Sequence, residues 1–303
     1  MPHQLDILIV GAGLSGLAAS IQCALSGHSV TVLEGAKELA EVRMRGSNHS
    51  MRSHDADQCV EQIGAGLQLT PNATRLLQQW GVYDAIRHEV CEPQTLTVHN
   101  YRGKILAQEI DFDKNIRRKY RAPFADCHRV DLQRALVERA RELGVSVVLD
   151  AKVSDIDFGN GPRSIATVST SDGNTYVADL IVGADGLWST CRSTFLGRKD
   201  TPLPTGDLAY RIVLHTDQIK DEKLRDMVLT PACRFWAGPD AHAVAYSMRG
   251  GRMYNVVLLV PDDLEEGIAR TEGNLDEMRK LFKGWDPVYS CQFHMTAMTA
   301  TVS

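Results

Sequence analysis

The sequence lacks long apolar runs, and its short ones are broken by glycine, serine or charged residues, so we expect no membrane-spanning helix. It also lacks lysine or arginine near the start, where Asp6 stands instead, which argues against a secretory signal. There is no excess of positive charge to hold a nucleic acid, because the formal net charge is −5. These absences predict a cytoplasmic protein with no nucleic acid partner and no membrane span.

Cysteine is sparse and has no pattern. The seven cysteines are odd in number and scattered, with no CxxC pair, which is typical of reduced thiols rather than a disulfide framework. We therefore expect no metal site. The rest of the composition, 44% hydrophobic and 23% charged over 303 residues, is that of a globular chain of one large or two ordinary domains.

The N-terminal sequence predicts a strand, a glycine-rich turn, a helix and a second strand. Leu5–Val10 is a branched apolar run that predicts a buried strand, and residues 11–16 (GAGLSG) follow it at once. Leu14–Leu25 predicts a helix, and Ser29–Leu33 predicts another buried strand with Glu34 at its end. A helix between two strands predicts that they pair in parallel through a right-handed crossover.

The GxGxxG pattern is weak alone, but this context is typical of a dinucleotide site. Gly11 permits the tight turn, Gly13 lets a pyrophosphate approach the backbone, and Gly16 lets helix and strand pack closely. The helix N-terminus offers free N–H groups and the positive end of its dipole. Glu34 lies 23 residues after Gly11, where a carboxylate accepts ribose hydroxyls and repels a 2′-phosphate. The pattern predicts FAD or NAD rather than NADP.

Later segments predict two hairpins, a helix and a second sheet. Thr95–Asn100 pairs with Lys104–Ile110, and Ser164–Thr170 pairs with Thr175–Val182 across an Asp-Gly turn. Residues 131–143 have helical spacing, and Val145–Leu149 predicts a strand. Four apolar strands predict an antiparallel sheet: 208–214, 232–238, 241–248 and 254–260. The fold class is α/β, with a Rossmann-type domain (1–90 and 121–200) interleaved with a β domain (91–120 and 201–287).

Three further stretches carry a family resemblance. They are residues 64–73 (GAGLQLTPNA), 127–132 (CHRVDL) and 182–189 (VGADGLWS). With the N-terminal motif, they resemble the group A FAD-dependent aromatic hydroxylases, and within that group the fungal salicylate-hydroxylase-like monooxygenases. The resemblance covers nearly the whole chain. It favours FAD over NAD, and it implies an FAD-binding domain interleaved with a substrate-binding antiparallel sheet.

The resemblance also implies roles for individual residues. Glu34 would bind the FAD ribose, Gly64 to Gly66 would lie along the ribityl and phosphate side, and Arg129 would contact the pyrophosphate. Asp185-Gly186 is similar to a motif implicated in both FAD and NAD(P)H binding, with Arg192 nearby. The expected cofactor-binding residues are Gly11, Gly13, Gly16, Glu34, Gly64, Ala65, Gly66, Arg129, Asp185 and Gly186.

On the substrate side, the resemblance directs attention to the later sheet. Arg211 and Tyr246 are the candidates for catalytic residues, because arginine pairs with a carboxylate or phenolate and tyrosine donates a hydrogen bond. The alternative is an exposed strand arginine and a tyrosine at the edge of the core. His128 is interpreted as a turn residue before Arg129 rather than as a base.

The activity that the resemblance implies is hydroxylation of a small aromatic or phenolic substrate, in secondary metabolism. NADH or NADPH would reduce FAD, and a flavin C4a-hydroperoxide formed with O₂ would transfer one oxygen atom. One alternative is another FAD oxidoreductase, such as an amine oxidase, although residues 35–41 lack the usual Gly-Gly-Arg. The other is an inactive, truncated product of a monooxygenase gene.

Two segments depart from the family pattern. Residues 42–62 are a polar stretch of 21 residues without periodicity, interpreted as an insertion from a retained intron. Residues 288–303 stand where the family continues into a second FAD motif of the form GDAxH, so this tail is interpreted as foreign to the family. Because the tail replaces this second FAD motif, we expect the chain as written to bind FAD poorly.

Overall fold

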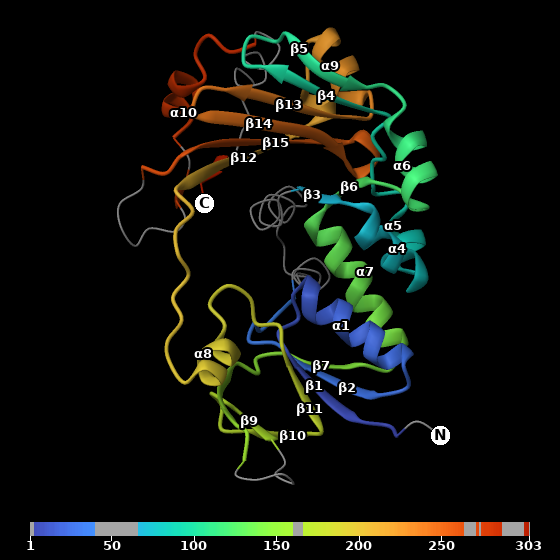
Figure 1. Ribbon diagram of the computed structural model, residues 1–303, viewed down its shortest axis with the longest axis vertical. Coiled ribbons are helices and arrows are strands. Elements are labelled where there is room, and N and C mark those ends of the chain that lie inside the picture. Colours follow the sequence, from blue (N-terminus) through green and yellow to red (C-terminus); the bar gives the residue numbers. More distant parts are fainter. Residues whose placement is uncertain are drawn as a thin grey trace, which may run out of the picture. The chain divides into compact units, whose positions relative to one another are not determined.

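The computed structural model describes residues 3–39, 66–159, 166–263, 271–272, 274–286 and 300–302 (Figure 1). The chain divides into two compact units. The first comprises residues 1–52, 80–82 and 132–203, and the second comprises residues 53–79, 83–131 and 204–303. The predicted insertion 42–62 lies outside the described residues, as does the predicted tail 288–303 except for residues 300–302.

The first unit is built on a parallel sheet with the strand order β11-β1-β2-β7. Its strands are β1 (Asp6–Val10), β2 (Ser29–Leu33), β7 (Ser146–Val148) and β11 (Leu180–Gly183). Helix α1 (Leu14–Leu25) links β1 to β2, which confirms the predicted parallel crossover. β1 is apolar and buried from Ile7 to Val10, as in a strand covered on both faces, whereas in β2 the buried residues are Val30, Val32 and Leu33.

An antiparallel sheet of β8 (Val153–Asp157), β9 (Ala166–Thr170) and β10 (Thr175–Ala178) packs on the parallel sheet around Leu8, Val10 and Leu33. The predicted strand Thr175–Val182 is wrong in one respect, since it is two strands. β10 ends at Ala178, the Asp179 N–H donates to the Asp6 carbonyl, and β11 then joins the parallel sheet. Helix α8 (Thr190–Leu196) follows β11.

The second unit contains an eight-stranded sheet with the order β16-β17-β12-β15-β14-β13-β4-β5 (Figure 1). The predicted antiparallel pairings are confirmed, but β4 and β13 pair in parallel. Its strands are β4 (Thr95–Asn100), β5 (Ile105–Glu109), β12 (Asp207–His215), β13 (Ala232–Gly238), β14 (Ala241–Met248), β15 (Met253–Pro261), β16 (Thr271–Glu272) and β17 (Ala300–Val302).

The two faces of this sheet are covered differently. Helices α9 (Glu222–Leu229) and α10 (Leu275–Leu281) bury one face, around Trp236, Tyr254 and Phe282. On the other face lies a short antiparallel ribbon of β3 (Gly66–Leu69) and β6 (Ala125–His128). Further helices of the chain are α4 (Pro71–Gln79), α5 (Val82–Ile86), α6 (Phe112–Tyr120) and α7 (Arg129–Glu142).

The units do not follow the predicted domain boundaries throughout. Residues 66–79 and 121–131 were expected in the nucleotide-binding domain, but they cluster with the second unit. The physical reason is the ribbon, because β3 pairs with β6 and hydrogen bonds to the eight-stranded sheet. None of the described helices is both long and apolar enough to cross a bilayer.

Candidate nucleotide site and substrate face

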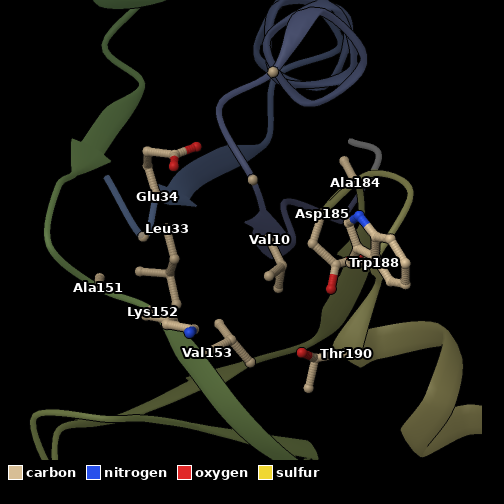
Figure 2. A pocket seen from close by; sticks show the side chains of 13 residues that line it. Val10, Leu33, Glu34, Ala151, Lys152, Val153, Ala184, Asp185, Trp188 and Thr190 are labelled. Atoms are coloured by element: carbon tan, nitrogen blue, oxygen red, sulfur yellow. The ribbon is translucent and has the colours of Figure 1, made fainter. Parts of the chain in front are cut away.

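A cavity of 520 Å³ opens in the first unit where β1 and β2 end (Figure 2). Its size lies within the usual range of small-molecule sites, about 300–1,000 Å³. Ligands of open α/β sheets bind at this carboxyl edge of the strands. The lining residues are Val10, Gly11, Gly13, Leu33, Glu34, Gly35, Ala151, Lys152, Val153, Ala184, Asp185, Trp188 and Thr190.

The glycine-rich turn closes one end of the cavity, and each glycine has a distinct environment. Gly11 has φ +103°, and a Cβ there would lie 2.5 Å from the Ala184 carbonyl oxygen. A Cβ on Gly16 would lie 1.9 Å from the Gly11 carbonyl oxygen. Gly13, in contrast, has nothing within 4 Å of its Cβ position. Gly11 and Gly16 are therefore required by the fold, whereas Gly13 leaves room for a ligand beside the backbone.

Glu34 ties the turn to the end of β2. One carboxylate oxygen accepts from the Ala12 N–H at 2.7 Å, and the other accepts from the Ala36 N–H at 2.9 Å. Two carboxylate oxygens offer about four lone-pair sites in all, so acceptor capacity remains for two ribose hydroxyls. These features fit the adenosine diphosphate half of a dinucleotide: open backbone at Gly13, the start of α1, and the Glu34 carboxylate that lines the cavity.

Asp185 lines the opposite side of the cavity (Figure 2). Its carboxylate accepts from the Ser189 hydroxyl at 2.5 Å and from the Cys191 N–H at 3.0 Å. Burial opposes ionisation, but these hydrogen bonds lower the pKa of Asp185 below its ordinary value. Gly186 has φ +79° in the same turn. Arg192 hydrogen bonds to Asp200 at 2.7 Å, so it secures the loop after α8.

Sequence analysis missed the residues that complete the cavity wall. Lys152 lies against Gly35, and the Trp188 ring lies on the side of Asp185 (Figure 2). Trp188 is 67% exposed although it is a large apolar side chain. Only Trp188 had a signal in the sequence, because it falls inside the 182–189 motif. Lys152 follows a short strand without any motif, and only the tertiary fold brings it here.

The remaining candidate cofactor residues lie elsewhere. Gly64 and Ala65 are outside the described residues, while Gly66 opens β3 and Arg129 opens α7 in the second unit. The interpretation of His128 as a turn residue is wrong, because His128 is the fully buried last residue of β6. Its Nδ1 accepts from the Val130 N–H at 3.3 Å, and burial lowers its pKa to about 4.

Arg211 and Tyr246 lie on the same face of the eight-stranded sheet. Arg211 on β12 is opposite Val257 on β15, and Val257 is opposite Val244 on β14, two residues before Tyr246. The Arg211 side chain is half-buried, and Tyr246 is only 3% exposed. The alternative of an exposed strand arginine does not match this burial. The Tyr246 hydroxyl forms no hydrogen bond with the described residues.

Comparison with known proteins places the chain in a family. Residues 6–292 match the family model described as FAD dependent oxidoreductase. The FAD-dependent monooxygenase OpS4 of Beauveria bassiana (strain ARSEF 2860) is 44% identical over 292 residues, covering 95% of this chain and 62% of that protein. The 3-hydroxybenzoate 6-hydroxylase of Polaromonas naphthalenivorans (strain CJ2) is 30% identical over 287 residues, covering 94% of this chain and 64% of that protein.

The chain thus spans less than two thirds of the length of these two relatives. A solved structure, described as a salicylate hydroxylase substrate complex, superposes with a TM-score of 0.73. The superposition covers 100% of this chain and 68% of that one at 18% identity, so it shows a shared fold. The mixed α/β architecture and the family match agree with the resemblance found in the sequence. The chain belongs to the FAD dependent oxidoreductase family.

Proposed function

We propose that this chain carries the FAD-binding and substrate-contacting parts of a monooxygenase that hydroxylates a small aromatic acid or phenol. The observation that carries the proposal is the cavity at the end of β1 and β2, with open backbone at Gly13 and the tethered carboxylate of Glu34. The names of the relatives support the aromatic substrate class, since they include a hydroxybenzoate hydroxylase.

In this proposal, the residues of the cavity hold the adenosine half of FAD. Glu34 accepts the ribose hydroxyls, the backbone at Gly13 and the start of α1 receive the pyrophosphate, and Trp188 covers the open rim. FAD, when bound, would supply the redox chemistry: with two electrons from NADH or NADPH, one oxygen atom of O₂ would enter the ring and the other would leave as water. Gly66, Arg129 and the Asp185-Gly186 pair remain proposed cofactor contacts.

The substrate would lie on the open part of the sheet face. Phe235, Val244 and Val257 form a half-buried apolar strip on three neighbouring strands, and Arg211 stands at its β12 end. An apolar floor that ends in a guanidinium suits a planar aromatic ring with a carboxylate or phenolate. The Tyr246 hydroxyl beside this strip can donate to a ring substituent. A role in secondary metabolism is proposed from the resemblance alone.

The test is a flavin titration followed by turnover. The purified 303-residue chain is titrated with FAD while flavin fluorescence is followed, and then NADH and NADPH oxidation is measured with and without 3-hydroxybenzoate. The proposal expects saturable FAD binding and oxidation that the aromatic acid stimulates. Arg211→Met should weaken 3-hydroxybenzoate binding by about tenfold or more and leave FAD affinity unchanged, since a charge-assisted pair contributes about 1.5–3 kcal/mol.

The same titration separates the alternatives. Saturable FAD binding without stimulation by any aromatic acid would favour another FAD oxidoreductase. Absence of FAD binding would favour an inactive product, and weak binding would agree with the expectation drawn from the sequence. A chain that binds FAD tightly and hydroxylates 3-hydroxybenzoate would overturn that expectation of poor binding.

A further inference from the structure

A polar junction lies between the β3–β6 ribbon and the eight-stranded sheet, where apolar packing would be the ordinary solution. The Gln68 amide on β3 donates to the Asp126 carboxyl on β6 at 3.1 Å. The same amide nitrogen lies 2.9 Å from Cys233 Sγ on β13. Asp126 is 1% exposed, and Cys233 is fully buried. Buried polar groups cost free energy unless they form hydrogen bonds. The Gln68 side chain meets this requirement and so links three strands: β3, β6 and β13.

The ribbon contacts Tyr246 through Gly66. Gly66 and Gln68 share one face of β3, because side chains alternate along a strand. A Cβ on Gly66 would lie 2.6 Å from Tyr246 Cε2 and 2.7 Å from the Tyr246 hydroxyl oxygen. The tyrosine ring therefore lies directly against bare backbone. Any shift of β3 across the sheet would move this ring.

Asn255 fixes the same point from the neighbouring strand. It lies opposite Tyr246 in the β14–β15 register, and its Oδ1 accepts from the Gly66 N–H at 3.3 Å. Asn255 is fully buried, and its Nδ2 has no partner among the described residues. The Tyr246 hydroxyl forms no hydrogen bond with another described residue. The unbonded Nδ2 of Asn255 costs stability, because a buried donor without an acceptor is unfavourable.

We propose that Asp126 and Gln68 are positioning residues: by bridging β6, β3 and β13 they hold Gly66 against Tyr246, and so fix the direction of the Tyr246 hydroxyl toward the substrate. This role rests on the proposed function, in which Tyr246 contacts the substrate. Asp126 and Gln68 touch neither substrate nor cofactor in this scheme.

The first readout follows Tyr246 without any ligand. The full chain is labelled with 3-fluorotyrosine, and the ¹⁹F resonance of Tyr246 is assigned by its loss in Tyr246→Phe. Asp126→Leu and Gln68→Leu should shift this resonance, because both remove the bridge. Asp126→Asn should leave it in place, since an asparagine carbonyl accepts from Gln68 as the carboxyl does.

Ser247→Ala is the matched control. Ser247 is the next residue on β14, is 1% exposed, and donates to the Val228 carbonyl at 2.5 Å on the opposite face of the sheet. Its loss removes a buried hydrogen bond on the same strand without touching the ribbon. A Tyr246 resonance that is unmoved in folded Asp126→Leu and Gln68→Leu, or that moves equally in Ser247→Ala, would overturn the proposal.

The second readout is the affinity of the FAD-loaded chain for 3-hydroxybenzoate. Asp126→Leu and Gln68→Leu should raise the Kd about tenfold, whereas Asp126→Asn and Ser247→Ala should keep it within about twofold. An unchanged Kd in both leucine variants would overturn the positioning role. If the unmodified chain binds no 3-hydroxybenzoate or other aromatic acid, the proposed function fails, and the ¹⁹F result still decides whether the bridge holds Tyr246.

Discussion

The nucleotide cavity and the proposed substrate face, the sheet surface that carries Arg211, Val244, Tyr246 and Val257, differ in what lines them. The cavity combines the glycine backbone at Gly11 and Gly13 with two carboxylates that hydrogen bonds hold in place, Glu34 and Asp185. The substrate face is made of side chains, in which Arg211 and Tyr246 stand beside an apolar strip. A site made of backbone requires specific residues at fixed spacing. A site made of side chains tolerates many substitutions, so the same sheet can serve different substrates.

This contrast predicts that the largest effect on stability comes from the turn itself. Gly16→Ala should destabilise the chain by about 2 kcal/mol or more, because the new Cβ would lie 1.9 Å from the Gly11 carbonyl oxygen. Urea unfolding measures the change. Gly13→Ala is the control within the same turn, since it has open space at its Cβ and an ordinary φ of −69°. Equal losses in the two variants would contradict the assignment of separate roles.

The next effect separates ligand binding from folding at Gly13. Gly13→Ala should lower FAD affinity by about tenfold or more while changing unfolding free energy by less than about 1 kcal/mol, because its methyl group would occupy the space beside the backbone. Flavin fluorescence titration gives the affinity. An unaltered Kd in Gly13→Ala would show that no phosphate approaches the backbone there.

The same contrast explains how much could be predicted from the sequence. The strand–helix–strand order at the N-terminus predicted the parallel crossover, and the spacing of Gly11, Gly13 and Gly16 predicted the tight turn, because local geometry demands those glycines. The antiparallel sheet was also predicted from its apolar strands. The parallel pairing of β4 with β13 was not, because it joins residues far apart in the chain, and no local pattern encodes it.

The junction around Asp126 shows the same limit. Asp126 stands in a short strand, FADCH, where it has the appearance of a surface residue. Asp126 is buried where its own strand β6 meets β3 and β13. Its proposed positioning role therefore depends on tertiary contacts. The break at Asp179 was missed for a related reason. Residues 175–178 pair with β9 and residues 180–183 pair with β1, so two different sheets use one stretch of sequence.

The junction yields a pH-dependent prediction. Burial raises the pKa of Asp126 well above its ordinary value of 3.8, and the hydrogen bond from Gln68 only partly offsets this. The folded chain therefore keeps a proton that the unfolded chain releases, so stability falls as pH rises from about 4 toward the raised pKa. Asp126→Asn has no such proton and should gain stability over the unmodified chain across this window.

Each unit by which the pKa is raised corresponds to about 1.4 kcal/mol. Thermal unfolding of Asp126→Asn and of the unmodified chain at a series of pH values measures the difference in their stability. Asp172→Asn is a surface control, because Asp172 is exposed in the β9–β10 turn and its pKa is lowered rather than raised, by the Thr170 hydroxyl and the Asn174 amide. If the stability difference between Asp126→Asn and the unmodified chain does not widen as pH rises, Asp126 is not a buried, protonated acid.

The smallest effect is expected at Trp188, an exposed aromatic side chain that lines the nucleotide cavity. Trp188 is 67% exposed, and its ring lines the cavity as an aromatic contact surface. Trp188→Ala should weaken FAD binding about threefold, and Trp188→Phe should restore most of the loss, since aromatic contacts contribute about 0.5–1.5 kcal/mol. Fluorescence titration of both variants decides the point. A tenfold or larger loss in Trp188→Ala would mean that this site, too, depends on its side chains, and the contrast with the substrate face would then be one of degree.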